Sequence, residues 1–183
     1  DTVAFADTTT SATIDLGDDN DGLTIADAAT KTTITAASGN NTFGLEEASS
    51  ITLTSGDGND KVTASAAVAT ATINVAGGKD TVDITGAFDT SELKLGDGND
   101  SVDISSTSST STIYGGGGND SFTLGGTATK LFLQDNQGNN TIKIGDAGST
   151  SNATIIAGDG NDKIEDTTGG DNDNELLVTS SID

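Results

Sequence analysis

Four short segments of the chain combine closely spaced glycines with a carboxylate, and these residue types could bind a metal ion. They are residues 56–60 (GDGND), 96–100 (GDGND), 116–120 (GGGND) and 158–162 (GDGND). Gly, Asn and Asp tolerate the positive φ angles of tight turns, in which backbone carbonyls can face one point. A carboxylate beside such carbonyls offers only oxygen ligands at flexible geometry. This ligand set suits Ca²⁺, whereas Mg²⁺ requires a stricter octahedron.

Weaker copies of the same segment occur along the whole chain. We take the last Asp or Asn of each copy as the reference position of a repeat, and these positions lie 19 to 22 residues apart. The reference positions are Asp1, Asp21, Asn41, Asp60, Asp80, Asp100, Asp120, Asn140, Asp162 and Asp183. Self-similarity with this period is typical of a solenoid. We therefore expect residues 1–183 to form a single elongated domain of about nine coils.

Apolar and polar residues alternate on both sides of each turn. The residues two and four places after the reference position are nearly always apolar, as in Val82 and Ile84. The residue seven places before it is apolar too, and often the one five places before, as in Ile73 and Val75. A period of two predicts half-buried strands, and no segment has helical spacing. The expected fold is all-β, a right-handed parallel β-roll or β-helix with two short strands per coil.

The connection between the two strands of a coil is rich in small residues and differs in length from coil to coil. We expect it to be an outer bend without fixed chemistry. The acidic, Gly-rich residues 166–174 are expected to form a longer and less ordered loop. In the last coil, the expected inward pair is Leu176 and Val178.

The composition excludes several classes of function. The chain carries 29 acidic residues against seven lysines, no Arg, and a net charge of -22. Nucleic acids and acidic membrane surfaces would be repelled, and no apolar run is long enough to span a membrane. His and Cys are absent, so most catalytic constellations and thiolate metal sites are missing, and we expect no enzyme activity. The chain begins on the repeat register without Met, so we expect a piece of a larger protein.

Stacking the coils creates an electrostatic problem at the reference positions. Equivalent residues of neighbouring coils lie roughly 4.8 Å apart. Two unit charges at that distance repel by ~0.9 kcal/mol in bulk water, and by several-fold more where solvent is excluded. A row of carboxylates therefore calls for positive charge between them, and only Lys79 lies in such a turn. Several Ca²⁺ ions along one edge would supply this charge.

The turns and the strands after them resemble the calcium-binding nonapeptide of RTX (repeats-in-toxin) proteins, Gly-Gly-x-Gly-x-Asp-x-apolar-x. Residues 115–123 match every position, and residues 55–63, 95–103 and 157–165 depart only at the first Gly. The resemblance implies a β-roll in which Asp carboxylates and turn carbonyls hold Ca²⁺ between stacked coils. The family's coil usually has two such turns in 18 residues, whereas this chain has one in about 20, which implies calcium along one edge only. The implied ligand positions are Asp21, Asp60, Asp80, Asp100, Asp120 and Asp162, weaker sites at Asn41 and Asn140, and the turn glycines Gly56, Gly58, Gly96, Gly98, Gly116, Gly118, Gly158 and Gly160.

The resemblance also implies a role. Bacterial surface-layer proteins and large adhesins often carry such repeats, so we expect a structural module of a secreted cell-surface protein. In that class, calcium drives folding after type I secretion, and the partners are flanking domains or neighbouring copies in a surface assembly. Two alternatives remain open, an accessory calcium module of a carbohydrate-active enzyme and an ice-binding solenoid. The second is suggested by a threonine column, Thr13, Thr33, Thr52, Thr72, Thr112 and Thr154.

Overall fold

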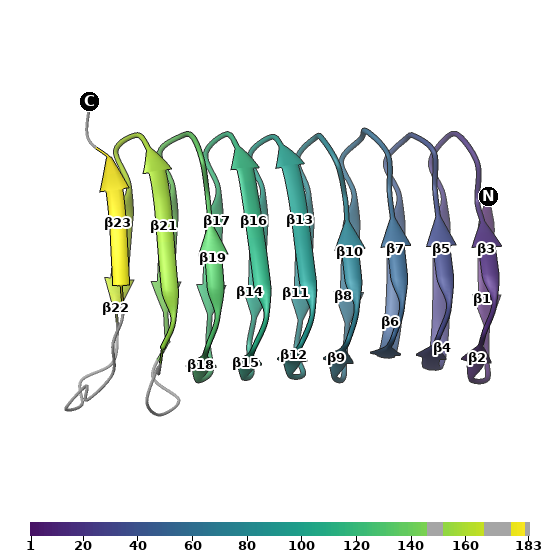
Figure 1. The fold of residues 1–183 in the computed structure, drawn as a ribbon. Helices are drawn as coiled ribbons and strands as arrows, with labels where there is room; N and C mark the ends of the chain where they lie inside the picture. The colour runs from purple at the N-terminus through teal and green to yellow at the C-terminus, as the bar shows by residue number, and fades with distance from the viewer. Residues whose placement is uncertain (146–151, 167–176, 182–183) are drawn as a thin grey trace.

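The computed structural model describes residues 1–145, 152–166 and 177–181. They form an all-β, right-handed parallel β-roll of about eight turns with about 20 residues per turn, as the repeat predicts (Figure 1). Within these ranges there is no helix, and hence none that could cross a membrane. The expected loop at 166–174 and the reference position Asp183 lie outside the described residues, apart from the backbone of Asp166 at the end of a strand.

Each coil contributes strands to two parallel sheets. The first strand of each coil belongs to a 14-stranded sheet. These first strands are β1 (Thr2–Phe5), β4 (Gly22–Thr30), β6 (Thr42–Ser49), β8 (Lys61–Ala64), β11 (Thr81–Ile84), β14 (Ser101–Ile104), β17 (Ser121–Leu124), β20 (Thr141–Ile144) and β22 (Lys163–Asp166). The second strands form a 9-stranded sheet. They are β3 (Thr13–Asp15), β5 (Thr33–Thr35), β7 (Thr52–Thr54), β10 (Thr72–Asn74), β13 (Glu92–Asp97), β16 (Thr112–Gly117), β19 (Phe132–Gln134), β21 (Thr154–Asp159) and β23 (Leu177–Ser181).

The register aligns equivalent residues of successive coils. In the first sheet Val82 pairs with Val102 and Ile84 with Ile104, so the inward positions stack along the rod. The last coil departs from the expected register, because Val178 rather than Leu176 occupies the position opposite Ile155. A longer segment precedes β23, and the spacing of 21 residues to Asp183 therefore does not carry the alignment of the earlier coils.

The core is a single apolar column enclosed by the two sheets. Phe43, Phe88 and Phe122 are fully buried along it, and the alternating Val, Ile and Leu residues of the strands surround them. The first coil is an exception, because β1 pairs only with β4. Phe5 is consequently 36% exposed, although its position in the repeat predicts an inward side chain. Burial of an apolar column is the main stabilising contribution to such a rod.

The connection between the two strands is more regular than the sequence predicts. Short strands pair across this bend in five coils, β2 (Thr9–Thr10), β9 (Val68–Ala69), β12 (Phe88–Asp89), β15 (Ser108–Ser109) and β18 (Ala128–Thr129), while β4 and β6 run into it. One residue of each bend has φ between 50° and 55°, and these residues are Ser11, Lys31, Ser50, Thr70, Thr90, Thr110, Lys130 and Asn152. The two expected strands of each coil are present, and the bend between them has a regular backbone geometry that was not predicted. The left-handed residue escaped notice because most of these side chains do not favour positive φ.

Candidate metal-binding turns

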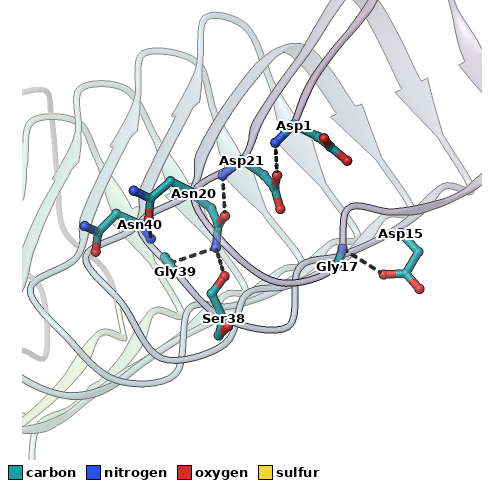
Figure 2. Close-up of polar contacts among 9 residues, drawn as sticks. Asp1, Asp15, Gly17, Asn20, Asp21, Ser38, Gly39 and Asn40 are labelled. Carbon is teal, nitrogen blue, oxygen red and sulfur yellow. Dashed lines mark hydrogen bonds and ion pairs between the residues drawn. The ribbon is translucent and has the colours of Figure 1, made fainter.

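The reference residues from Asp21 to Asp162 form a continuous row on the edge where second strands turn into first strands, at the top of Figure 1; those from Asp21 to Asn140 are buried, and Asp162 is half-buried. In each coil, the backbone N–H of the reference residue donates to Oδ1 of the reference residue in the next coil. The donor–acceptor distances are 2.7–2.9 Å from Asp21 to Asp162, and the amino group of Asp1 contacts Asp21 in the same way. Figure 2 shows the beginning of this row around Asp21. We call Asp21, Asn41, Asp60, Asp80, Asp100, Asp120, Asn140 and Asp162 the buried row.

A second row of side chains stabilises the outside of the same turns. Asn40 N–H donates to Asn20 Oδ1 at 2.7 Å, and the same bond is repeated between later coils. These bonds run in the opposite direction to those of the buried row. Lys79 interrupts the row, because its own N–H donates to Asn59 but its side chain has no acceptor to offer to the next coil. The two rows together hold each turn against both of its neighbours.

Glycine is required in the turns because the backbones of neighbouring coils lie in close contact. Gly98 has φ of 151°, and a Cβ atom added there would lie 1.5 Å from the carbonyl oxygen of Gly78. The other glycines two places before a reference residue meet the preceding coil in the same way. This stacking places carbonyl oxygens of one turn directly against the glycines of the next. The sequence correctly predicted which residues form the turns, and the close contact explains why the glycines recur.

Each aspartate of the buried row has one satisfied and one unsatisfied oxygen. Among the described residues, the buried Oδ2 atoms without a hydrogen-bond donor include those of Asp21, Asp60, Asp80, Asp100, Asp120 and Asp162. Asn41 provides a comparison within the chain, because it carries a nitrogen at the second side-chain position. Its Nδ2 donates to Gly39 O at 2.9 Å and to Ser55 Oγ at 3.1 Å. The turn thus surrounds this position with acceptors, and in the aspartate coils an oxygen takes the place of the donor.

Burial makes the ionised form of these aspartates unfavourable in the absence of a cation. The pKa of Asp80 is raised to about 7, mainly by burial; the Asp100 and Asp60 carboxylates also raise it, while the hydrogen bond from Asp60 N–H lowers it. The pKa of Asp100 rises to about 6 for the same main reason, and burial also raises that of Asp120. The site therefore needs either a proton or a bound cation for each such carboxylate near neutral pH.

The mid-turn carboxylates have a different environment. Asp57, Asp97 and Asp159 are exposed. Gly77 and Gly117 separate Asp57 and Asp97 from their next acidic neighbours along the outside of the rod. In the part of the chain that the structure describes, no three acidic side chains converge so as to hold a metal ion by themselves. A cation in the turns would therefore combine one carboxylate oxygen with backbone carbonyls.

Asp135 is a buried acidic residue that belongs to the strand pattern of the repeat and lies outside the glycine turns. It lies five places before a reference residue, where other coils carry Leu16, Ala36, Val75 or Leu95, and its side chain is fully buried. Its pKa is raised to about 8, mainly by burial and then by the negative charges of Asp120 and Asp162. An aspartate at this offset was the available signal, since an acid at an inward strand position is costly without a partner.

One open groove lies on the outer face of the first sheet. It encloses about 340 Å³ and is lined by Thr24, Gly44, Glu46, Thr63 and Asp83, among others. The hollow arises at Gly44, which has no side chain, whereas its neighbours in register, Thr24 and Thr63, carry side chains there. The groove holds two carboxylates, hydroxyl groups and aliphatic surface.

The fold and the turns define a parallel β-solenoid whose coils meet along a buried row of aspartates. Comparison of the chain with protein-family models, curated proteins and solved structures gives no match. A function is therefore inferred from the chain's own residues.

Proposed function

We propose that this chain is a calcium-binding structural module of a secreted bacterial cell-surface protein, which folds and stiffens when Ca²⁺ binds. The observation that carries the proposal is the set of buried Oδ2 atoms without donors along the buried row. Burying an ionised carboxylate without a partner costs roughly several kcal/mol. A chain that repeats this feature in coil after coil therefore needs a compensating positive charge.

The chemistry of the turns favours Ca²⁺ over other cations. The ligand atoms would all be oxygens, from one carboxylate per coil and from the carbonyls of the stacked glycine turns. At the position of the carboxylate oxygen, Asn41 has an N–H group instead. Ca²⁺ accepts six to eight oxygen ligands at varied angles, whereas Mg²⁺ holds its waters and an octahedral geometry. Asn41 and Asn140 already donate to neighbouring oxygens, so calcium binds more weakly at those two coils.

The remaining residues support a scaffold rather than an enzyme. The sequence has no His, Cys or Arg, and its single Tyr114 lies beside Lys94 and Phe132 on the outer face of the second sheet. The net charge of -22 disfavours binding to nucleic acid or to acidic membranes. The resemblance of the turns to RTX repeats supports secretion by a type I system and a place in a surface layer or adhesin. Its partners would be flanking domains or neighbouring copies.

Far-UV circular dichroism in EDTA, followed by addition of Ca²⁺ or Mg²⁺, tests the proposal. At pH 7.5 we expect a largely unfolded chain in EDTA and a β-sheet spectrum in millimolar Ca²⁺, with Mg²⁺ a poor substitute. Binding to the folded state alone adds RT ln(1 + [L]/Kd) per site, about 2.7 kcal/mol at a hundredfold excess over Kd. A full β-sheet spectrum and an unchanged melting temperature in EDTA, after metal analysis shows no bound calcium, would refute it.

Ice binding is the second candidate, and the sheet register is what favours it. Thr13, Thr33, Thr52 and Thr72 pair in one column. A second column beside it contains Thr35 and Thr54, flanked by Asp15 and Asn74. Such a flat array can order water, but Glu92 and Phe132 interrupt the first column in later coils. Thermal hysteresis of the calcium-loaded protein tests this function, and hysteresis lost in Thr52→Lys would establish it.

A further inference from the structure

A pair of carboxylates lies inside the solenoid where one turn meets the next coil. Asp120 belongs to the buried row, and Asp135 lies in the following coil, directly after β19. Their relative exposures are 2% and 0%, and the negative charge of Asp120 raises the pKa of the Asp135 carboxyl group. Neither group carries a donor when ionised.

The backbone holds one oxygen of each carboxylate and leaves the other without a donor. Asp120 Oδ1 accepts from Asp100 N–H at 2.8 Å, and Asp135 Oδ1 accepts from Asn136 N–H at 2.8 Å. The Oδ2 atoms of both residues are buried and have no hydrogen-bond donor. Two unpartnered carboxylate oxygens, each fixed in orientation by its sister atom, thus share one enclosed region.

The preceding coil leaves room for this pair. Gly115 takes the place that an inward side chain occupies in most coils, and an added Cβ there would lie 2.7–2.9 Å from the carboxyl atoms of Asp135. The Asp135 side chain therefore leans over Gly115 toward the coil that contains Asp120. A larger residue at position 115 could not coexist with this arrangement.

Equivalent positions elsewhere in the chain show what such a contact requires. Asn41 stands to Ser55 as Asp120 stands to Asp135, and there Nδ2 donates to Oγ at 3.1 Å. In the coils of Asp60 and Asp80, the facing residues are Val75 and Leu95, which offer no ligand atom. Among these contacts, only the one between Asp120 and Asp135 brings together two acceptors that carry the same charge.

We propose that Asp120 and Asp135 together hold one divalent cation inside the rod, and that Ca²⁺ is the ion its oxygen ligands select. Asp135 lies outside the glycine turn, so this is a site with two carboxylates, in contrast to the turns with one. In the equivalent turn of Asn41, Nδ2 donates to the carbonyl of Gly39, and the corresponding carbonyl in the Asp120 turn is that of Gly118. Two negative charges neutralise one dication, and affinity for Ca²⁺ rises with the number of charged ligands. The site depends on the proposed function only through Asp120, which is also a ligand position of the turns, whereas its second ligand, Asp135, is not part of a turn.

Calcium titration by calorimetry at pH 7.5 tests the site in the full chain and in Asp135→Asn. The wild-type protein should bind one ion at least about tenfold more tightly than the rest, and Asp135→Asn should lose this tight class while keeping the weaker ones. The control is Asp103→Asn, which removes one exposed carboxylate from β14 and should leave the titration unchanged. Asp135→Ala, which places the residue of Ala36 and Ala157 at this position, serves if the amide variant does not fold.

Terbium luminescence excited through tyrosine gives a local signal. Tyr114 is the one tyrosine of the chain and pairs in register with Gln134, next to Asp135. Tb³⁺ bound between the carboxylates should emit strongly in the wild type, and the emission should be lost in Asp135→Asn and retained in Asp103→Asn. Calcium should displace the Tb³⁺.

The outcomes separate this site from the proposed function. Equal calcium stoichiometry, affinity and terbium emission in wild type and Asp135→Asn would overturn the two-carboxylate site and leave the turns as calcium ligands. A single bound ion in the wild type, lost in Asp135→Asn, would support the site and refute calcium along the whole row. No calcium binding by the wild type would overturn both.

Discussion

Replacing Asp80 by Asn tests the electrostatics of the buried row without any metal. Asp80 is fully buried, its Oδ1 accepts from Asp60 N–H, and its Oδ2 has no donor. Burial raises its pKa from 3.8 to about 7. At roughly 1.4 kcal/mol per pKa unit, ionised Asp80 destabilises the folded chain by up to ~4 kcal/mol above pH 7. Asn removes this charge and adds an N–H donor, as at Asn41. We therefore expect Asp80→Asn to raise the free energy of unfolding in EDTA at pH 7.5 by ~2–4 kcal/mol.

The pH dependence of the metal-free protein has a definite sign. Because the folded-state pKa of Asp80 lies above that of the unfolded chain, its protonation stabilises the folded state at low pH. This stabilisation is complete below about pH 4 and is lost as the pH rises through about 7. Wild-type protein in EDTA should become more stable from pH 7.5 to pH 5, and Asp80→Asn should gain less. Because the metal-free wild type is expected to be largely unfolded at pH 7.5, the fraction of folded protein in EDTA, measured by far-UV circular dichroism at both pH values, gives the difference.

Asp97→Asn is the matched control, because it removes the same charge from an exposed turn position. We expect it to change the free energy of unfolding by less than about 0.5 kcal/mol. Equal stabilisation by Asp80→Asn and Asp97→Asn would show that net charge, and not burial of the row, sets the pH dependence. A metal-free protein that loses stability as the pH falls from 7.5 to 5 would refute the reasoning altogether.

Three further predictions concern the turns. Asp100→Ala should lower the calcium stoichiometry and the melting temperature in Ca²⁺, whereas Asp97→Ala should leave both nearly unchanged; equal effects in titration calorimetry would mean that the exposed carboxylates are the ligands. Gly98→Ala should destabilise the protein by ~3 kcal/mol or more, because its Cβ would overlap a carbonyl of the preceding coil. Gly77→Ala is the control, since its Cβ would make ordinary contacts of 3.5 Å, and it should cost less than about 1 kcal/mol in urea denaturation. Lys79→Asn should complete the outer asparagine row and raise the free energy of unfolding by about 1 kcal/mol, and a melting temperature no higher than that of Lys79→Gln would contradict this role of the row.

The sequence predicted the fold because the repeat links two independent signals at a fixed offset. Apolar alternation, as at Val82 and Ile84, identifies the strands and their inward faces, and the glycine turns set the register between coils. Every coil carries the same signals, so an error in one coil does not alter the architecture. The register was wrong only in the last coil, where Val178 takes the position expected for Leu176.

The features that the sequence did not reveal depend on three-dimensional contacts. Thr70 and Thr90 adopt a left-handed conformation that their side chains disfavour, so nothing in the residue type marks the bend. The hydrogen bonds along the buried row were also not foreseen, since simple stacking of carboxylates suggested repulsion alone. A backbone N–H lies between successive carboxylates and stabilises one oxygen of each, as Asp60 N–H does for Asp80. Asp135 was overlooked, although its place five residues before Asn140 is an inward position of the repeat.

An anomalous-difference map from crystals grown with CaCl₂ would test the central claim most directly. Calcium peaks are expected inside the turns, each beside the Oδ2 atom of a buried-row aspartate such as Asp60, Asp80 or Asp100, with only weaker peaks beside Asn41 and Asn140. Calcium bound only at exposed carboxylates such as Asp57 and Asp97, or no calcium in the turns at all, would contradict it.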